Sequence, residues 1–504
     1  MGGFPWLTVL GAVPLAGSVG VGLLPRGRDL LAKRTALLVS LVALALALAV
    51  AIQFRPGGPR FQFTENYPWI PQFGIGYSLG VDGIALVLIG LSAILVPVVI
   101  LASWNEVESG RSVKAFFSML LMLEAMMIGV FAATDVFFFF VLFEASLVPM
   151  YFIIGSYGGP QRSYAAVKFL LYSLLGGLLM LVAVIGLYVL AGTFEFTRLT
   201  GLDIAAGTER WLFLGFFIAF AIKAPLWPFH TWLPDAAAQA PAGGAVLLVG
   251  VLDKAGTYGM IRYCLELFPN ASRYFTPAII ALSVVGILYG ALLAVGQADM
   301  KRLIAYTSLS HFGFIGLGIF AMTSQGQSGA TLYMVNHGFA TGALFLIAGF
   351  LMARNRSRLI DDYGGVQRVA PLLAGTFLVA GLSGLSLPGL NSFVSEFLVL
   401  VGTYTRYPVP AVLGTLGVIL AALYILWLYQ RTMTGPVSER VQNMQDLRPR
   451  ELWAIGPLVA LIIALGLYPK PVLDVINPAV QHTMQQVQVS DPPPEVPAAQ
   501  GEGS

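Results

Sequence analysis

The amino-acid sequence predicts an all-α polytopic membrane protein with about fourteen transmembrane helices, and three observations support this fold class. Hydrophobic residues make up 57% of the 504 residues, charged residues only 11%, and the mean hydropathy is +0.80. A soluble domain is far more polar. Apolar windows of ~20 residues, long enough to cross a ~30 Å hydrocarbon core, recur along the whole chain. Two of these windows are interrupted by proline, glycine and polar residues.

The windows define the expected order of elements. The longest connections on one side, 54–80 and 192–210, are too short for a separate domain. The apolar N-terminus runs directly into the first window, so we expect no cleavable signal peptide. The proline-rich, polar stretch from Asp491 onward is expected to be disordered. The fourteen windows begin near Pro5, Arg34, Val81, Ser112, Asp135, Ser163, Trp211, Ala242, Phe275, Arg302, Gly329, Pro371, Pro408 and Glu451.

Lysine and arginine are distributed unequally between the loops, and this bias predicts the orientation. The side that includes the loop after the first window holds seventeen of the 28 Lys and Arg residues, and the opposite side holds eight. Lys168, Lys223 and Lys254 lie within windows. Because the positive side faces the cytoplasm, we expect a multi-pass protein of a bacterial cytoplasmic membrane with both termini outside.

The seventh window contains the first interruption, at residues 221–235, AIKAPLWPFHTWLPD. Its prolines remove backbone donors and disfavour a continuous helix. Lys223 follows about twelve apolar residues. A charge at that depth costs about 2.5–3.5 kcal/mol on the insertion scale unless protein or water surrounds it. We expect a half-helix that ends at Lys223 and places its negative dipole end beside the ammonium. The alternative is a kinked structural helix.

The twelfth window, 371–402, contains the second interruption, GLSLPGLNSFVSEF. Ser392 is expected to cap the half-helix that follows, which puts Glu396 in its first turn, where the positive dipole end favours a carboxylate. The interrupted windows are five apart, and this odd spacing gives equivalent helices opposite directions, as in an inverted repeat. We therefore expect N-terminal helices in 1–110, a first five-helix unit in 111–270, a second in 271–435, and the last helix with the tail in 436–504.

Several ionisable groups fall near the middle of their windows and predict a polar layer at the membrane midplane. With a rise of ~1.5 Å per residue, they lie roughly 13–18 Å into the core. Unpaired and exposed to lipid, they would together cost on the order of 15 kcal/mol, so they must face inward, pair and be hydrated. Acids, amines and imidazoles in one plane suit a proton relay, whose candidate members are Glu144, Lys223, Lys254, His311, His337 and Glu396.

Each candidate also has a structural alternative. Glu144 could bond a neighbouring hydroxyl, and His311 and His337 could serve packing of their own helices. Glu124 and Lys168 also lie within windows and are weaker relay candidates, because they could serve helix contacts. The sequence leaves open the roles of three further polar residues, Asp235, Asp253 and His230.

The sequence argues against several function classes. Cys264 is the only cysteine, so the chain has no internal disulfide and cannot hold an iron–sulfur cluster through several thiolates. It has no glycine-rich nucleotide-binding loop, and its four histidines lie in separate segments, unlike a metal or haem set. The net charge of +3 is spread over loops, so nucleic-acid binding is not expected. We expect no redox cofactor, nucleotide or metal in this chain.

Four long motifs resemble those of one family. EASLVPMYFIIG contains Glu144, IKAPLWPFHTWLPDAAAQAP contains Lys223, LDKAGTYGMIR contains Lys254 and DMKRLIAYTSLSHFGF contains His311. Together they resemble the antiporter-like proton-translocating subunits of respiratory complex I, NADH:quinone oxidoreductase, from about the third window to the fourteenth. Sister subunits of that family usually carry lysine in the twelfth helix. The branch called chain M or subunit 4 carries glutamate, as Glu396 does here.

The resemblance implies a fold, a mechanism and partners. In that family, fourteen helices form two inverted five-helix units whose seventh and twelfth helices are broken. The resemblance implies that Glu144 and Lys223 form a modulating pair, that Lys254 is the central relay lysine, and that His311 and His337 connect the two halves. It implies that this subunit moves protons, while flavin, iron–sulfur clusters, NADH and quinone bind partner subunits. The expected partners are other membrane-arm subunits, including two sister antiporter-like subunits, and the lipid bilayer.

Three other functions stay open from the sequence. A subunit of a multisubunit cation/proton antiporter would be a pure transporter, although Glu396 argues against it. A membrane subunit of an energy-converting hydrogenase would have similar helices and a different electron partner. A structural scaffold would keep these charges without using them. The sequence LDKAG differs from the commoner sequence around the family's lysine, and this difference leaves the role of Asp253 undecided.

Overall fold

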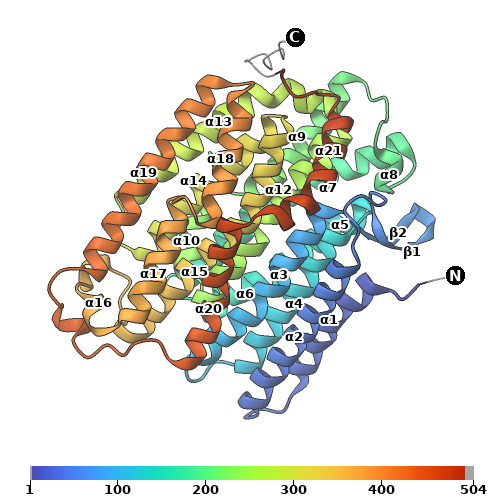
Figure 1. Cartoon of the computed structure of the whole chain (residues 1–504). Helices are drawn as coiled ribbons and strands as arrows, with labels where there is room; N and C mark the ends of the chain where they lie inside the picture. Colours follow the sequence, from blue (N-terminus) through green and yellow to red (C-terminus); the bar gives the residue numbers. More distant parts are fainter. Residues whose placement is uncertain (1–2, 494–504) are drawn as a thin grey trace, which may run out of the picture.

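The computed structural model describes residues 3–493, and these form one bundle of helices that run roughly antiparallel to one another (Figure 1). Most of the tail that the sequence predicts to be disordered, 494–504, lies outside the described residues. The fold class is therefore confirmed as all-α.

Twelve helical segments of the described chain are long and apolar enough to cross a membrane, and they match twelve of the fourteen predicted windows. One of them, Ala242–Leu265, is buried inside the bundle from Gly243 onward. It is built from α11 (Ala242–Leu247), η3 (Leu248–Leu252), α12 (Lys254–Gly259) and η4 (Met260–Leu265). The other eleven are α1 (Trp6–Leu23), α2 (Asp29–Gln53), α3 (Gly83–Ala102) with η2 (Ser103–Asn105), α4 (Val113–Ala132), α5 (Val136–Ala145) with α6 (Leu147–Tyr157), α7 (Arg162–Ala191), α13 (Pro269–Val295), α14 (Met300–Phe320), α15 (Ser324–Asn355), α19 (Pro408–Met433) and α20 (Pro449–Leu467).

Side-chain caps begin several of these helices. An oxygen of the residue before the helix accepts a hydrogen bond from a backbone N–H of the first turn, which satisfies a donor that has no partner within the helix. The capping residues are Asp82 for α3, Ser112 for α4, Asp135 for α5, Asp299 for α14 and Thr323 for α15.

The other two predicted windows are each divided into two helices. The seventh comprises α9 (Ala206–Lys223) and α10 (Trp232–Gln239), and the twelfth comprises α17 (Pro371–Gly384) and α18 (Asn391–Tyr404). α9 ends at Lys223, as the sequence predicts. Two statements stay predictions. One is that each broken pair of helices crosses the membrane once, and the other is that the two five-helix units are inverted copies.

Two details of the second break differ from the sequence-based expectation. Leu390, not Ser392, is at the N-cap of α18, and it makes no side-chain capping bond. Gly389, with φ of +95°, reverses the chain directly before Leu390, so the helix begins at Asn391. Glu396 consequently lies in the second turn, and the argument from a first-turn carboxylate is wrong.

A β-hairpin occupies the long connection that the sequence analysis left without structure. β1 (Gln62–Ile70) pairs antiparallel with β2 (Ile75–Val81), and Gly74 makes the turn after η1 (Pro71–Phe73) with φ of +63°. Glu65 of β1 accepts hydrogen bonds from the first backbone N–H groups of α1, at 2.8 Å from Leu7 N. The hairpin therefore holds the start of α1 on its own side of the bundle. The remaining short helices are α8 (Phe196–Leu199), α16 (Val366–Val369), η5 (Ile360–Asp362) and η6 (Glu439–Val441).

The sequence analysis also missed α21 (Lys470–Val487), which crosses the bundle obliquely after α20 (Figure 1). Its many polar residues lower the hydropathy below that of a span, although one face is apolar. Ile476, Val480 and Met484 are buried on that face, and the helix packs against α3 and α15. Asp491, just beyond it, accepts a hydrogen bond from Ser324 N at 2.8 Å, so the segment after α21 lies against the start of α15 at this residue.

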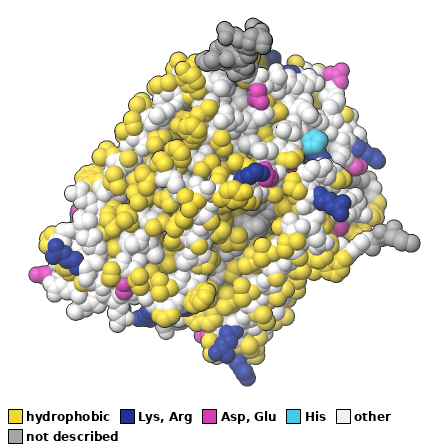
Figure 2. All heavy atoms as spheres, in the orientation of Figure 1, with side chains coloured by type: hydrophobic (Ala, Val, Ile, Leu, Met, Phe, Trp, Pro, Cys, Tyr) yellow, Lys and Arg dark blue, Asp and Glu magenta, His cyan; other side chains and the backbone are white. Residues whose placement is uncertain are grey.

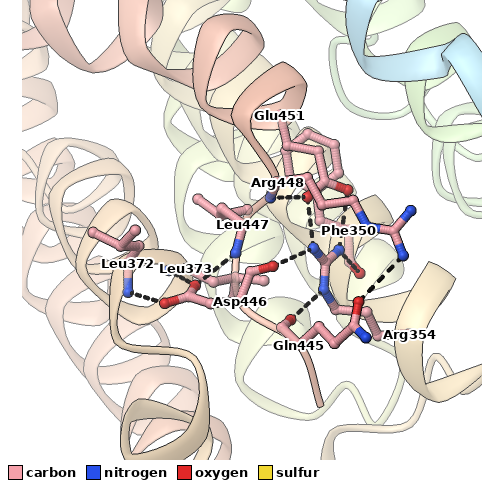
Figure 3. Close-up of polar contacts among 9 residues, drawn as sticks. All are labelled: Phe350, Arg354, Leu372, Leu373, Gln445, Asp446, Leu447, Arg448 and Glu451. Carbon is pink, nitrogen blue, oxygen red and sulfur yellow. Dashed lines mark hydrogen bonds and ion pairs between the residues drawn. The ribbon is translucent and has the colours of Figure 1, made fainter.

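A polar clasp closes the opposite end of the bundle (Figure 3). The Arg354 guanidinium, near the end of α15, donates to both Glu451 oxygens of α20, at 3.2 and 2.5 Å. It also donates to the carbonyl of Asp446 at 2.9 Å. The Asp446 carboxylate accepts from Leu372 N and Leu373 N in the first turn of α17, each at 2.9 Å. The clasp therefore fixes the first half of the broken pair α17–α18 against α15 and α20.

The surface is typical of a protein that lies in lipid. Hydrophobic side chains cover most of the face in Figure 2, and charged side chains gather mainly at its margins. Large apolar residues such as Leu38 of α2, Val182 of α7 and Ile419 of α19 are 63%, 70% and 64% exposed. Such continuous apolar surface is unfavourable in water and favourable in a bilayer.

Candidate functional site

Glu144 lies at the division between α5 and α6. The chain turns at Ser146, whose hydroxyl donates to Phe143 O at 2.7 Å, and Glu144 is directed at α7. A side chain on Gly177 of α7 would overlap the Glu144 carboxylate, so this glycine makes room for the acid. Glu144 is half-buried, and its Oε1 has no hydrogen-bond partner among the described residues.

Lys223 lies at the end of α9, where the helix breaks. It is 1% exposed, and within the described chain its ammonium has no hydrogen-bond partner. The ammonium lies 4.5 Å from the ring centroid of Phe143, and its charged neighbours are Glu144 and Asp253. Trp232 donates its indole N–H to Ile222 O at 2.9 Å and so satisfies one of the last carbonyls of α9. The structure therefore brings Glu144 and Lys223 near each other without an ion pair between them.

Lys254 follows a change of helical pitch. In η3 the hydrogen bonds shift to the π pattern, and Asp253 N bonds to Leu248 O at 3.1 Å instead of to Val249 O. The Val249 carbonyl is thereby free, and the Lys254 ammonium donates to it at 2.5 Å. Single turns of π-helix inside α-helices are frequent at functional sites.

Lys254 and His337 are in direct contact. Lys254 is fully buried, and its Nζ lies 2.6 Å from His337 Nδ1 and 5.0 Å from the ring centroid of Phe312. The other ring nitrogen of His337, Nε2, lies 3.1 Å from the Ser308 hydroxyl of α14. When the ammonium donates to Nδ1, Nε2 carries a proton and donates to Ser308. The imidazole can therefore accept a proton on one side and release one on the other.

His311, Tyr333 and Glu396 continue from this pair into the second half of the bundle. The His311 ring centroid is 5.4 Å from that of His337 and 5.6 Å from that of Tyr333. Its Nε2 lies 3.1 Å from Gly384 O, at the end of α17, so the imidazole reaches the second break. The Tyr333 hydroxyl donates to Glu396 Oε1 at 3.0 Å, and Glu396 is only 4% exposed. The sequence analysis missed Tyr333, whose position four residues before His337 in α15 places both on one helix face.

An asparagine pair fixes the second break. Asn336 Nδ2 donates to Asn391 O at 2.7 Å, and Asn391 Nδ2 donates back to Asn336 O at 3.2 Å. Ser383, at the end of α17, donates to Asn391 Oδ1 at 2.5 Å. Because the Nδ2 group of each asparagine donates to the backbone carbonyl of the other, α15 holds the start of α18 at a defined place. Glu396 is positioned by this contact.

The weaker candidates lie apart from this series. Lys168 of α7 forms an ion pair at 2.7 Å with Asp235 of α10, which also pairs with Arg302 of α14 at 2.7 Å. His230 lies edge-on to a tyrosine ring, 5.1 Å between centroids, in the segment between α9 and α10. Glu124 of α4 is 1% exposed, and neither carboxylate oxygen has a partner among the described residues. None of these residues has a hydrogen bond in the described structure to the groups from Lys254 to Glu396.

Asp253, which the sequence left open, is fully buried beside Lys254. Both of its carboxylate oxygens lack a hydrogen-bond partner within residues 3–493. Over the same residues, no group of three or more His, Cys, Asp and Glu side chains is arranged to hold a metal ion.

Comparison with known proteins places these residues in a family context. The family described as "NADH:quinone oxidoreductase/Mrp antiporter, TM" matches residues 133–423, and "NADH-ubiquinone oxidoreductase chain 4, amino terminus" matches 37–130. NADH-quinone oxidoreductase subunit M of Mycobacterium tuberculosis is 53% identical over 98% of this chain and 97% of its own. A chain of respiratory complex I from Thermus thermophilus has a TM-score of 0.87 and 31% identity, over 95% of this chain and 99% of that one. A chain of the Mrp complex from a Dietzia species has a TM-score of 0.86 at 21% identity, over 96% and 99%, and shares the fold.

Proposed function

We propose a mechanism from one premise: the chain belongs to the antiporter-like family of NADH-quinone oxidoreductase subunits, in the subunit M or chain 4 branch. It is a proton-pumping subunit of the membrane arm of complex I, whose reaction passes electrons from NADH to quinone. We assign the electron transfer, with its flavin, iron–sulfur clusters, NADH and quinone, to partner subunits. The single cysteine and the scattered histidines of this chain support that division.

One observation carries the proposed proton path: the series of buried polar contacts from Lys254 through His337, His311 and Tyr333 to Glu396. Two contacts in it are hydrogen bonds, at 2.6 Å from Lys254 to His337 and at 3.0 Å from Tyr333 to Glu396. The rings between them are in direct contact, with the His311 ring centroid 5.4 Å from that of His337 and 5.6 Å from that of Tyr333. Lys254 is the proton donor of the series, the two histidines carry the proton, and Glu396 receives it.

Glu144 and Lys223 act as a switch on this series. Each of the two groups stabilises the charged form of the other when they lie close together. This electrostatic stabilisation is lost when they separate. The lack of an ion pair between them corresponds to a separated arrangement, and the non-helical chain after Lys223 permits movement of the ammonium. A lysine that feels a second positive charge nearby gives up its proton more readily, so Lys223 controls proton release from Lys254.

The finer organisation is part of the same proposal. Two inverted five-helix units, in 111–270 and 271–435, each supply one broken helix to the midplane. The loops rich in Lys and Arg face the cytoplasm of a bacterial cell, both termini lie outside, and the partners in the membrane arm include two sister antiporter-like subunits. Glu65 on Leu7 and Asp491 on Ser324 support a common side for the two ends. A reporter fused after Ser504 that is active only in the cytoplasm would refute this orientation.

Two experiments test the proposed function. Purification of the tagged chain from its native membrane should yield NADH- and quinone-binding subunits by mass spectrometry; only cation-antiporter or hydrogenase subunits would contradict the assignment. Lys254→Met, reconstituted with the complex into vesicles with a pH-sensitive dye, should abolish most proton uptake. Normal uptake at wild-type abundance would remove Lys254 from the path.

A further inference from the structure

Asp253 is a buried acid that the proposed relay does not use. It occupies the single residue between η3 and α12, is 0% exposed, and has two carboxylate oxygens without partners among the described residues. An isolated carboxylate in an apolar interior is strongly unfavourable unless a cation or a proton compensates it. Asp253 is therefore either protonated or compensated by a nearby cation at each stage of the reaction cycle.

The cationic side chains near Asp253 are those of Lys254 and Lys223. Lys254 is adjacent in sequence, but its ammonium is directed elsewhere, to Val249 O at 2.5 Å and His337 at 2.6 Å. Neighbouring helix positions face different directions, which explains why the adjacent pair does not bond. The Lys223 ammonium, by contrast, has no hydrogen-bond partner in the described structure. One unpartnered cation and one unpartnered anion thus lie in the same buried region.

Close packing keeps these two groups near each other. A Cβ on Gly256 of α12 would lie 2.6 Å from Phe220 O and 2.7 Å from Ala224 N, the residue directly after Lys223. Such distances are too short for a side chain, so the backbone of α12 touches the backbone at the end of α9. The helix that carries Asp253 and the half-helix that carries Lys223 are therefore in backbone contact.

We propose that Asp253 is a second docking position for Lys223, so that the Lys223 ammonium alternates between Glu144 and Asp253. This inference deepens the proposed function and rests on the Glu144–Lys223 switch. Glu144, half-buried against α7, is the outer position, and fully buried Asp253 is the inner one. The present structure, with the ammonium over Phe143 and bonded to neither acid, lies between the two.

Every proton is accounted for in both positions. In the outer position, Glu144 neutralises Lys223, and Asp253 compensates the ammonium of Lys254 through space. In the inner position Lys223 takes Asp253 for itself, and Lys254 loses that compensation. An N–H bond of the Lys254 ammonium then breaks and an N–H bond forms at His337 Nδ1, which leaves a neutral amine and an imidazolium. Glu144, freed of its cation, takes up a proton from the half-exposed side. These five groups then carry one more positive charge until His337 passes its proton on toward Glu396.

A permanent counter-ion for Lys254 is the simpler role for Asp253, but the geometry argues against it. Such a counter-ion would bond the ammonium that it neutralises, as buried ion pairs require good geometry to be favourable. Here the ammonium bonds a carbonyl and an imidazole, and the carboxylate stays free.

The test compares substitutions at Asp253 in the whole complex, reconstituted into vesicles that report proton uptake and NADH oxidation together. Asp253→Asn keeps the size and removes the charge, and it should lower proton uptake per NADH on the order of tenfold. Asp253→Glu restores a carboxylate and should recover a substantial part. A packing role predicts the reverse order, with Asn tolerated and Glu impaired. Asp361→Asn, a change at an acid that is paired with Arg431 at the surface, is the matched control.

Assembly and a second readout complete the design. If Asp253→Asn and Asp253→Ser both fail to assemble while Asp253→Glu assembles, Asp253 is a folding residue and the proposal is overturned. Infrared spectra with isotope-labelled histidine should show more imidazolium in Glu144→Gln, where Lys223 has only the inner position, and less in Asp253→Asn. Equal imidazolium content in the two variants would contradict the docking exchange.

The failure of this inference is distinguishable from failure of the proposed function. Lys223→Ala is measured in parallel. If proton uptake is impaired in Lys223→Ala but normal in Asp253→Asn, only the inner docking position is refuted. Normal proton uptake in Lys223→Ala refutes the switch itself.

Discussion

Tyr333→Phe should uncouple Glu396 from the rest of the relay. The substitution removes one oxygen and leaves the ring that lies 5.6 Å from His311 in place. It deletes the hydrogen bond of 3.0 Å to Glu396 Oε1, in a site where the acid is 4% exposed. A hydrogen bond to a charged group contributes about 1.5–3 kcal/mol, and about 1.4 kcal/mol corresponds to tenfold in rate. Proton uptake should therefore fall roughly 10- to 100-fold.

The assay measures proton uptake and NADH oxidation in vesicles that contain the intact complex. Tyr263→Phe is the matched control, because it removes a buried hydroxyl that has no hydrogen-bond partner in the described chain. It should pump normally. Wild-type uptake in Tyr333→Phe, at wild-type abundance, would refute the hydroxyl as a link in the relay.

Three further predictions concern other parts of the chain. Glu396→Gln should lower proton uptake at least tenfold with little loss of assembly, and Glu396→Lys should recover part of it; equal uptake in Gln and wild type would exclude Glu396. Gly177→Ala should displace the Glu144 carboxylate and reduce uptake severalfold while the complex still assembles, whereas Gly375→Ala, which meets no atom within 4 Å, should have no effect. Burial raises the pKa of Asp135 from its ordinary 3.8 to about 6. The folded chain therefore holds that proton more tightly, and the resulting stabilisation, roughly 3 kcal/mol at most, is present below pH 3.8 and lost as pH rises through 6. Thermal release of this chain from the purified complex should become easier between pH 5 and 7.5 in the wild type, and Asp135→Asn should remove most of that change.

Hydrophobicity and proline placement predicted the helices well because lipid leaves few alternatives for the backbone. The predicted starts at Ala242, Pro371 and Pro408 coincide with helix starts in the structure. α13 begins at Pro269, six residues before the predicted Phe275, because its polar first turns lower the local hydropathy. α21 escaped prediction for the same reason.

The sequence predicted the ionisable members of the candidate site from their depth, but depth does not determine partners. Lys168 has an acid within 2.7 Å only because the break after α9 turns α10 and Asp235 toward α7. The sequence analysis did not single out Tyr333, and only the position of α18 shows that its hydroxyl meets Glu396. Asp253 likewise lacks a hydrogen-bond partner among the described residues because the ammonium of the adjacent Lys254 is directed to His337.

The central claim, that Glu144 and Lys223 control proton movement through this chain, is tested most directly by the proton-to-electron ratio of three variants. Glu144→Ala and Lys223→Ala should each abolish most proton translocation in vesicles while the complex assembles. The double substitution should lose less than the two single losses combined, because both act through one coupling. A wild-type ratio in either single variant would contradict the account.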